Sequence, residues 1–181
     1  MSRSATPARW FAFLRAINVG GHTVKMERLA ALFRELGLED VETFIASGNV
    51  VFQSTEKDPA KLERRLEAHL GEALGYDVAT FLRTRAELAA IAGRHPFGEE
   101  PGGTVYVGFL ERAPDAAAAR ALSALGNEVD EFAVVGREVH WLARKGMGRS
   151  TFSGARLERM LGMATTLRNL NTVARLLARH D

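Results

Sequence analysis

The chain has 181 residues, 46% hydrophobic and 25% charged, so it is long and apolar enough to bury a core. It contains no cysteine, which excludes disulfides, thiolate catalysis and cysteine-ligated metal sites. The formal net charge is +2, but residues 137–181 carry nine Lys and Arg against three Asp and Glu, a local net of +6 that suits phosphate or another acidic partner.

The first half of the chain alternates strand and helix patterns. Ser47-Gly48-Asn49 is typical of a hairpin turn, and Asp58-Pro59 is typical of a helix start. The expected elements, in chain order, are a strand at 10–17, a helix at 26–36, strands at 41–46 and 50–54, a helix at 58–74 and a strand at 77–83.

The second half repeats this order after a short helix at 86–93. The expected elements are a strand at 104–110, a helix at 114–125, strands at 129–135 and 138–142, a helix at 151–161, a strand at 164–167 and a terminal helix capped by Asn169. Two βαββαβ orders predict an α+β protein made of two consecutive ferredoxin-like (α-β plait) units, each an antiparallel sheet with helices on one face.

This organisation predicts four segments along the chain. Residues 1–9 are expected to be a disordered N-terminus, 10–83 the first unit, 84–102 a connecting helix and loop, and 103–181 the second unit with basic C-terminal helices. The apolar run from Trp10 to Ile17 is interrupted by Arg15 and is far shorter than the roughly 20 residues of a membrane helix. We therefore expect a cytoplasmic protein with no membrane partner.

The loop from Asn18 to Lys25 is the first candidate anion site. Adjacent Gly20 and Gly21 let successive N–H groups point into one concavity, and the helix that follows adds the positive end of its dipole. The loop matches neither of the two glycine-rich motifs that bind nucleotides. The alternative is a tight turn that needs glycine dihedral angles.

Arg15 is a second candidate because it shares an alternation face with Phe11, Phe13 and Ile17. A guanidinium in apolar surroundings must reach a carboxylate, a carbonyl, water or a ligand. The alternative to a ligand is a structural ion pair.

Two segments near the C-terminus place cations and hydroxyls at expected helix starts. If these two starts converge, Lys145, Arg149, Ser150, Arg168 and Asn169 would form a pocket with phosphate-binding geometry. The alternative is that Ser150 and Asn169 cap helices while the arginines are solvated.

Histidine and serine chemistry have little support. The five histidines are at least 26 positions apart, so no local metal spacing exists, and each is expected at the surface or in a turn. Ser47 does not lie in a G-x-S-x-G motif. We expect no metal and no cofactor.

Four segments, read in order, resemble one family. They are Leu14-Arg-Ala-Ile-Asn-Val-Gly-Gly21, Ile45-Ala-Ser-Gly-Asn-Val-Val-Phe52, Gly148-Arg-Ser150 and Thr166-Leu-Arg-Asn169. The chain, from about Phe11 to Leu177, resembles the bacterial domain of unknown function 1697 (DUF1697) family. The resemblance implies two linked α-β plait units and implies no activity, because the family has no established one.

Three functions remain open. The first is an anion- or phosphate-binding module whose partner is a nucleic acid or a phosphorylated small molecule. The second is a small enzyme acting on a phosphorylated or carboxylated metabolite, although no general base is evident, and the third is a structural protein that forms a homodimer through its edge strands. The residues expected to bind the anion are Arg15, Asn18, Gly20, Gly21, Ser47, Asn49, Lys145, Arg149, Ser150, Arg168 and Asn169.

Overall fold

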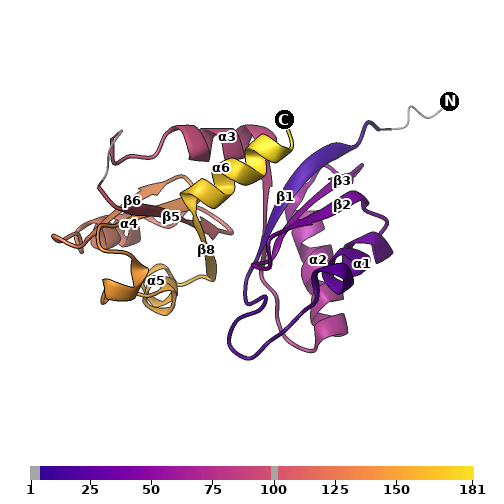
Figure 1. Ribbon diagram of the computed structural model, residues 1–181, viewed down its shortest axis with the longest axis horizontal. Helices are drawn as coiled ribbons and strands as arrows, with labels where there is room; N and C mark the ends of the chain where they lie inside the picture. The colour runs from indigo at the N-terminus through magenta and orange to yellow at the C-terminus, as the bar shows by residue number, and fades with distance from the viewer. Residues whose placement is uncertain (1–4, 99–101) are drawn as a thin grey trace. The chain divides into compact units, whose positions relative to one another are not determined.

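The computed structural model describes residues 5–98 and 102–181. The chain divides into two compact units, Met1–Glu87 (unit 1) and Leu88–Asp181 (unit 2), and each contains a four-stranded antiparallel sheet (Figure 1). The strand orders are β2-β3-β1-β4 and β6-β7-β5-β8. This order confirms the predicted α+β fold with two ferredoxin-like units. No helix among the described residues is long and apolar enough to span a bilayer.

Unit 1 follows the predicted element order with shifted boundaries. Its elements are β1 (Ala8–Leu14), α1 (Met26–Glu35), β2 (Glu39–Phe44), β3 (Asn49–Ser54), α2 (Pro59–Leu74) and β4 (Thr80–Thr84), after which α3 (Arg85–Gly93) begins. The expected disordered N-terminus falls partly on residues 1–4, which lie outside the described residues. Ala8 and Arg9 are ordered by pairing with Ser54 and Gln53 of β3.

The core of unit 1 lies between the sheet and the helices α1 and α2 (Figure 1). One alternation of β1 supplies Trp10, Ala12 and Leu14, and the leucines of α2 recur every four residues along one face of that helix. Ile17 joins this same core. The expectation that Ile17 shares a face with Arg15 is wrong, because Ala16 takes a positive φ of 62° and breaks the strand alternation between them.

Unit 2 contains the predicted elements in order and, in addition, a short 3₁₀ helix. They are β5 (Thr104–Leu110), α4 (Ala116–Ser123), β6 (Asp130–Val135), β7 (Glu138–Ala143), the 3₁₀ helix η1 (Met147–Arg149), α5 (Gly154–Leu161), β8 (Thr165–Asn169) and α6 (Leu170–Arg179). The helix expected from residue 151 begins at Gly154, because the Ser153 side chain accepts a hydrogen bond from the N–H of Arg156 at 3.2 Å. Asn169 caps α6, as predicted.

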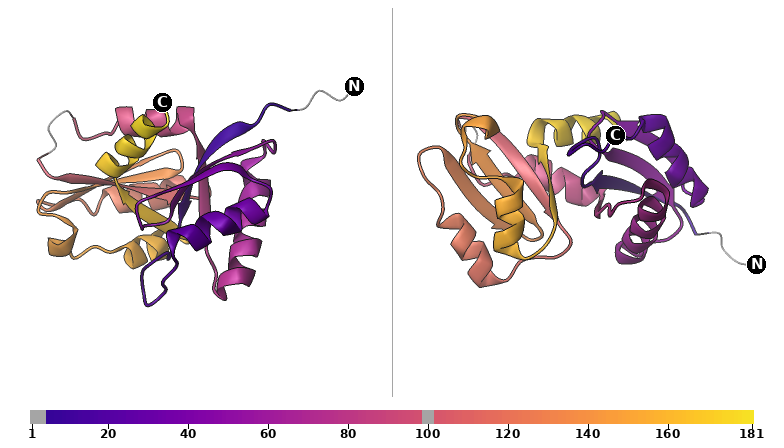
Figure 2. Two further views of the ribbon diagram at one scale, coloured as in Figure 1. Left: turned by 45° about the vertical axis from the view of Figure 1, so that its right-hand side comes forward. Right: turned by 90° about the horizontal axis from the view of Figure 1, so that it is seen from below.

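The sheet of unit 2 is covered on both faces (Figure 2). One face packs against α4 and α5 around Trp141, Phe152 and Leu157. Helix α6 contacts β5 and β8, and its buried residues Leu170 and Val173 are not part of that core. The expectation of helices on one face only is therefore incomplete, because β5 is apolar on both of its alternations.

The outer edge of β4 is closed by glutamate side chains. The N–H groups of alternate residues Thr80, Leu82 and Thr84 point away from the neighbouring strand. They donate to Glu67 at 2.9 Å, Glu63 at 2.9 Å and Glu87 at 2.7 Å, respectively. An unpaired strand edge invites pairing with another chain, so these carboxylates both satisfy the backbone and block the edge.

The last strand of unit 2 uses the same arrangement. The N–H of Thr165 donates to Glu158 of α5 at 3.1 Å. The Nη1 atoms of Arg83 and Arg168 donate to the preceding carbonyls, those of Leu82 at 2.9 Å and Leu167 at 3.0 Å. The structural repeat is therefore visible in the sequence over two short matching segments, Thr80-Phe-Leu-Arg83 and Thr165-Thr-Leu-Arg168.

Replacing Glu63 tests this edge closure. The buried N–H of Leu82 loses its acceptor in Glu63→Ala, so we expect a loss of about 1–3 kcal/mol in the free energy of unfolding, measured by urea denaturation. Glu72→Ala is the matched control, because Glu72 is exposed on the same helix and should change stability by less than about 0.5 kcal/mol. Equal losses in the two variants would contradict a specific role for Glu63.

Candidate functional site

Two loops of unit 1, residues 15–25 and 45–48, meet at one end of the sheet and are named here the loop cluster. The side chain of Asn18 joins them. Its Nδ2 donates to the carbonyl of Ala46 at 2.9 Å, and its Oδ1 accepts from the N–H of Val24 at 2.7 Å. Asn18 therefore fixes the path of the first loop against the second.

The hairpin turn of the loop cluster is fixed from inside by Asn49. The Asn49 Nδ2 donates to the carbonyl of Phe44 at 3.0 Å and to the Ser47 hydroxyl at 2.9 Å. Gly48 has a φ of 80°, and a Cβ added there would lie 3.0 Å from the Cβ of Ile17. Ser47, Gly48 and Asn49 thus have structural roles, and anion binding by Ser47 and Asn49 stays a prediction.

The backbone of the loop cluster is strained. Three residues other than glycine have positive φ there: Ala16 at 62°, Asn18 at 57° and Ile45 at 50°. Each such residue costs about 1–3 kcal/mol and persists only where surrounding contacts hold it. Gly20 and Gly21, with φ of 60° and 86°, continue the first loop without this cost. Strain of this kind concentrates at binding sites.

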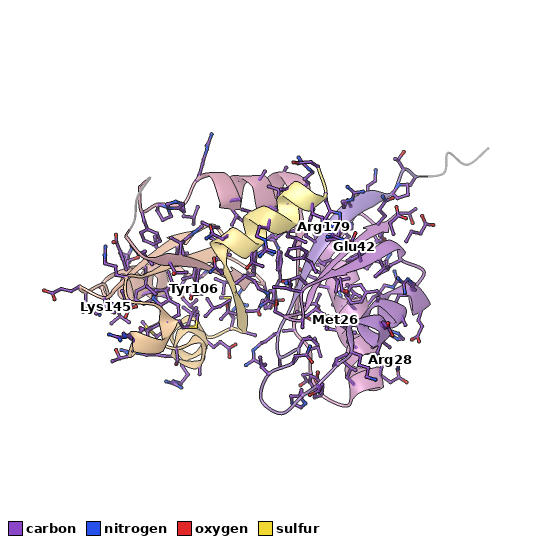
Figure 3. The ribbon with its side chains drawn as sticks, viewed as in Figure 1. Met26, Arg28, Glu42, Tyr106, Lys145 and Arg179 are labelled. Atoms are coloured by element: carbon purple, nitrogen blue, oxygen red, sulfur yellow. The ribbon has the colours of Figure 1, made fainter. Side chains whose placement is uncertain are left out.

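The first loop leads into a helix start that has a lysine at its N-cap. Lys25 is the N-cap residue of α1, and its side chain makes no capping hydrogen bond. Lys25 is exposed, and Met26, the first residue of α1, is labelled in Figure 3. A cation beside the positive end of a helix dipole is unfavourable by roughly 0.3–1 kcal/mol at an exposed position. The start of α1 therefore breaks the usual rule for helix capping.

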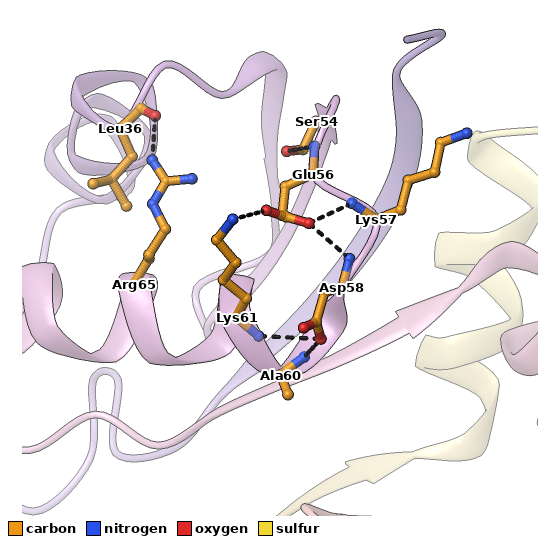
Figure 4. Close-up of polar contacts among 8 residues, drawn as sticks. All are labelled: Leu36, Ser54, Glu56, Lys57, Asp58, Ala60, Lys61 and Arg65. Atoms are coloured by element: carbon orange, nitrogen blue, oxygen red, sulfur yellow. Dashed lines mark hydrogen bonds and ion pairs between the residues drawn. The ribbon is translucent and has the colours of Figure 1, made fainter.

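The start of α2 provides a contrast within the same unit (Figure 4). Asp58 Oδ1 accepts from the N–H groups of Ala60 at 3.0 Å and Lys61 at 3.4 Å. Glu56 accepts from the N–H groups of Lys57 and Asp58, both at 3.0 Å, and forms an ion pair with Lys61. The Lys61 hydrogen bond, followed by that of Asp58, lowers the pKa of Glu56. The carboxylates of the chain itself occupy the anion position at α2.

A hollow of about 240 Å³ lies beside this network and is lined by residues that include Leu36, Ser54, Glu56 and Arg65. The Nη2 of Arg65, one of the lining residues, donates to the carbonyl of Leu36 at 3.1 Å (Figure 4). The guanidinium beside the hollow therefore already has a partner within the chain.

His22 extends the loop cluster toward the segment before β4. Its ring stacks on Tyr76 with 3.8 Å between ring centroids. Burial raises the pKa of Tyr76, so the phenol stays neutral and supports His22 through ring contact. The loop cluster consequently carries Arg15, which is half-buried, with exposed His22 and Lys25.

The structure gives Ser150 a structural role in unit 2. Its hydroxyl donates to Asp130 Oδ2 at 2.6 Å, and the indole N–H of Trp141 donates to Asp130 Oδ1 at 2.8 Å. Lys145 and Arg149 are exposed, and Lys145 projects away from the unit (Figure 3). Ser150 therefore holds the segment that carries these two cations.

The structure does not bring Arg168 together with Ser150. Asp130, the partner of Ser150, lies in β6 at one edge of the sheet, while Arg168 lies in β8 at the other edge. Arg168 is buried, its Nη1 donates to the Thr166 hydroxyl at 2.6 Å, and burial lowers its pKa to about 10. Asn169 Oδ1 accepts from the N–H of Asn171 at 2.9 Å. Anion binding by these residues stays a prediction, but one shared pocket is not formed.

His140 is a buried titratable residue that the sequence did not identify. It was expected at the surface or in a turn, but it is buried in the middle of β7, and its Nδ1 has no hydrogen-bond partner. Burial, followed by repulsion from His95, lowers the pKa of His140 to about 4. His95 also lines a hollow of about 310 Å³ together with Thr104, Asn169 and Asn171. Only the position of His140 within a strand pattern could have indicated its burial.

A family model described as "protein of unknown function (DUF1697)" matches residues 8–140, which is more than half of the chain. The chain belongs to the DUF1697 family. The matched residues include the whole loop cluster, whereas Gly148-Arg-Ser150 and Thr166-Leu-Arg-Asn169 lie beyond them. No curated protein matches the chain.

A solved structure supports the fold of this DUF1697 member. The conserved bacterial protein SP0830 from Streptococcus pneumoniae is similar over 96% of this chain and 98% of its own, with a TM-score of 0.73 and 20% sequence identity. At this identity the likeness shows the fold alone. In the described part of the chain, no three His, Asp or Glu residues are grouped so that they could hold a metal ion.

The buried histidine predicts an acid-sensitive fold. The pKa of His140 is about 6.5 when unfolded and about 4 when folded, so the unfolded chain binds the proton first as pH falls. Stability from neutral His140 should be fully present above pH 6.5 and lost progressively down to pH 4, by up to about 3 kcal/mol.

Urea denaturation of the wild type and of His140→Leu at pH 7.5, 6 and 5 measures this effect. The variant removes the orphaned Nδ1 and the titration, so its stability should fall less steeply with pH than that of the wild type. Parallel pH profiles for the two proteins would contradict the assignment.

Proposed function

We propose that this DUF1697 protein binds a phosphate-class anion at the loop cluster of unit 1. The observation that carries the proposal is the start of α1, where Lys25 stands at the N-cap without a side-chain cap. A helix start presents N–H donors and a partial positive charge, and a lysine adds a full one. An anion bound there would accept hydrogen bonds from the backbone and neutralise the lysine.

The first loop supports the proposal because it is fixed before any ligand binds. Asn18 ties it to Ala46 and Val24, and Gly20 and Gly21 allow backbone N–H groups to turn toward one point. A pre-organised site binds with a smaller ordering cost. Glu27 is the one carboxylate in the first turn of α1. Within the described residues its side chain accepts no hydrogen bond from the N–H groups of that turn, so it does not occupy the proposed anion position.

The ligand chemistry is a phosphate group, whose source can be a phosphorylated small molecule or a nucleic acid. A single phosphate on a small molecule gives a modest dependence of affinity on salt. A nucleic acid that contacts several cations gives a steep dependence, since each phosphate contact releases a counterion. Titrations with inorganic phosphate, with a mononucleotide and with a single-stranded oligonucleotide, each at two salt concentrations, separate these sources.

The variant Lys25→Glu tests the proposed site. Reversing this charge should weaken phosphate or mononucleotide binding by roughly tenfold or more, measured by calorimetry or by NMR titration. The control is Lys57→Glu, because Lys57 is also exposed and precedes a helix, but the start of α2 is already capped by Asp58. The control should bind like the wild type.

Two results would overturn the proposal. One is a wild-type chain that binds none of the three probes at low salt. The other is equal weakening by Lys25→Glu and Lys57→Glu, which would indicate a diffuse effect of charge and not a site at α1.

A further inference from the structure

The four edge strands of the two sheets differ in how their outer edges are closed. The edges of β4 and β8 carry the glutamate and arginine contacts described above. The pairing of β2 with β3 shifts register between Glu39 and Glu42, Asp40 has a φ of 46°, and Arg34 donates to the carbonyl of Val41 at 3.3 Å. A bulge of this kind blunts an edge for further pairing.

The remaining edge strand, β6, has an open outer edge. The N–H of Asp130 donates to Asn127 Oδ1 at 2.9 Å and its carbonyl accepts from the N–H of Asn127 at 2.7 Å, so both groups point away from β7. By strand alternation the backbone groups of Phe132 and Val134 point the same way. Within the described residues these groups of Phe132 and Val134 form no hydrogen bond.

The strand β6 is also regular enough to pair. Its register with β7 runs without a shift from Asp130 to Val135, and it contains no proline. Val135 at its end is 50% exposed. A straight edge with unpaired N–H and C=O groups and apolar side chains is a template for another strand.

We propose that β6 pairs with β6 of a second copy of this chain, antiparallel across a two-fold axis at Ala133. This register sets Phe132 opposite Val134 of the partner subunit, and the reverse, so all outward backbone groups of these residues are paired. A register centred on Phe132 or on Val134 would pair only half of these outward N–H and C=O groups. This edge belongs to unit 2, whereas the proposed anion site belongs to unit 1.

Charge favours a second copy as the occupant. The exposed Glu131 lies near the start of the strand, and Arg137 follows the strand in the turn to β7. Asp130 is buried against Ser150 and Trp141 and does not contribute to this charge pattern. Antiparallel self-pairing sets the acidic start of each strand beside the basic end of the other, so the edge is complementary to itself. A pairing of single strands buries little area, which predicts a weak dimer that dissociates on dilution.

A single introduced cysteine tests the register, because the chain contains none. At the two-fold axis the Cα atoms of the two copies of residue 133 would lie about 4.5 Å apart, within disulfide range. Ala133→Cys should form a disulfide-linked dimer under oxidised glutathione, faster than Ala117→Cys. Ala117 is the control because it is exposed on α4 of the same unit.

Opposite charges at the same position provide a second test. Ala133→Lys and Ala133→Glu each set like charges face to face, so each should dimerise about tenfold more weakly than the wild type in sedimentation experiments at pH 8. An equimolar mixture should recover the dimer as a heterodimer in native mass spectrometry. The same changes at Ala117 should leave association unchanged.

The proposal is overturned by a wild-type chain that stays monomeric at roughly 1 mM. That result would leave the edge of β6 for a strand of a different protein. It is also overturned if Ala133→Cys cross-links no faster than Ala117→Cys, or if the two charged variants associate no better together than alone.

Discussion

The fold depends on one constraint, which is that each backbone N–H and C=O removed from water needs a partner. Strand ladders and helix turns pair most of these groups, but the last strand of each sheet leaves a row of them at its outer edge. In this protein Glu63 and Glu67 reach the edge of β4 from α2, and Glu158 reaches β8 from α5. The helices that cover the sheets thus also supply hydrogen-bond acceptors to their edge strands, so the packing of each helix fixes the position of an edge strand.

The same constraint explains the polar residues of the family-like motifs. The side-chain amides of Asn18 and Asn49 donate to backbone carbonyls of the loop cluster. Ser150 donates to the buried carboxylate of Asp130, and Arg168 donates to a carbonyl and a hydroxyl. These side chains looked like ligand-binding groups because the same donors and acceptors serve both purposes. The start of α1, at Lys25, has no such side-chain cap, and it is the helix start at which we propose the anion binds.

Sequence predicted the fold more fully than the site. Periodicity identified the elements, and Asp58, Asn169 and the glycine turns gave helix starts and hairpins by local chemistry. It could not show that Ala16 reverses the strand alternation, because a positive φ at alanine is imposed by tertiary contacts. It also could not show that α6 covers the second face of its sheet or that His140 is buried, since both depend on which strands become neighbours.

Residue-resolved amide hydrogen exchange on the dilute chain tests the backbone account most directly. The N–H groups of Thr80 and Leu82 lie at a sheet edge but donate to glutamates. The account predicts that these amides are strongly protected and exchange only when the whole unit unfolds. It predicts fast exchange at Met26 and Phe132, whose N–H groups have no such side-chain partner. Fast exchange at Leu82, or protection of Phe132 equal to that of Leu82, would contradict it.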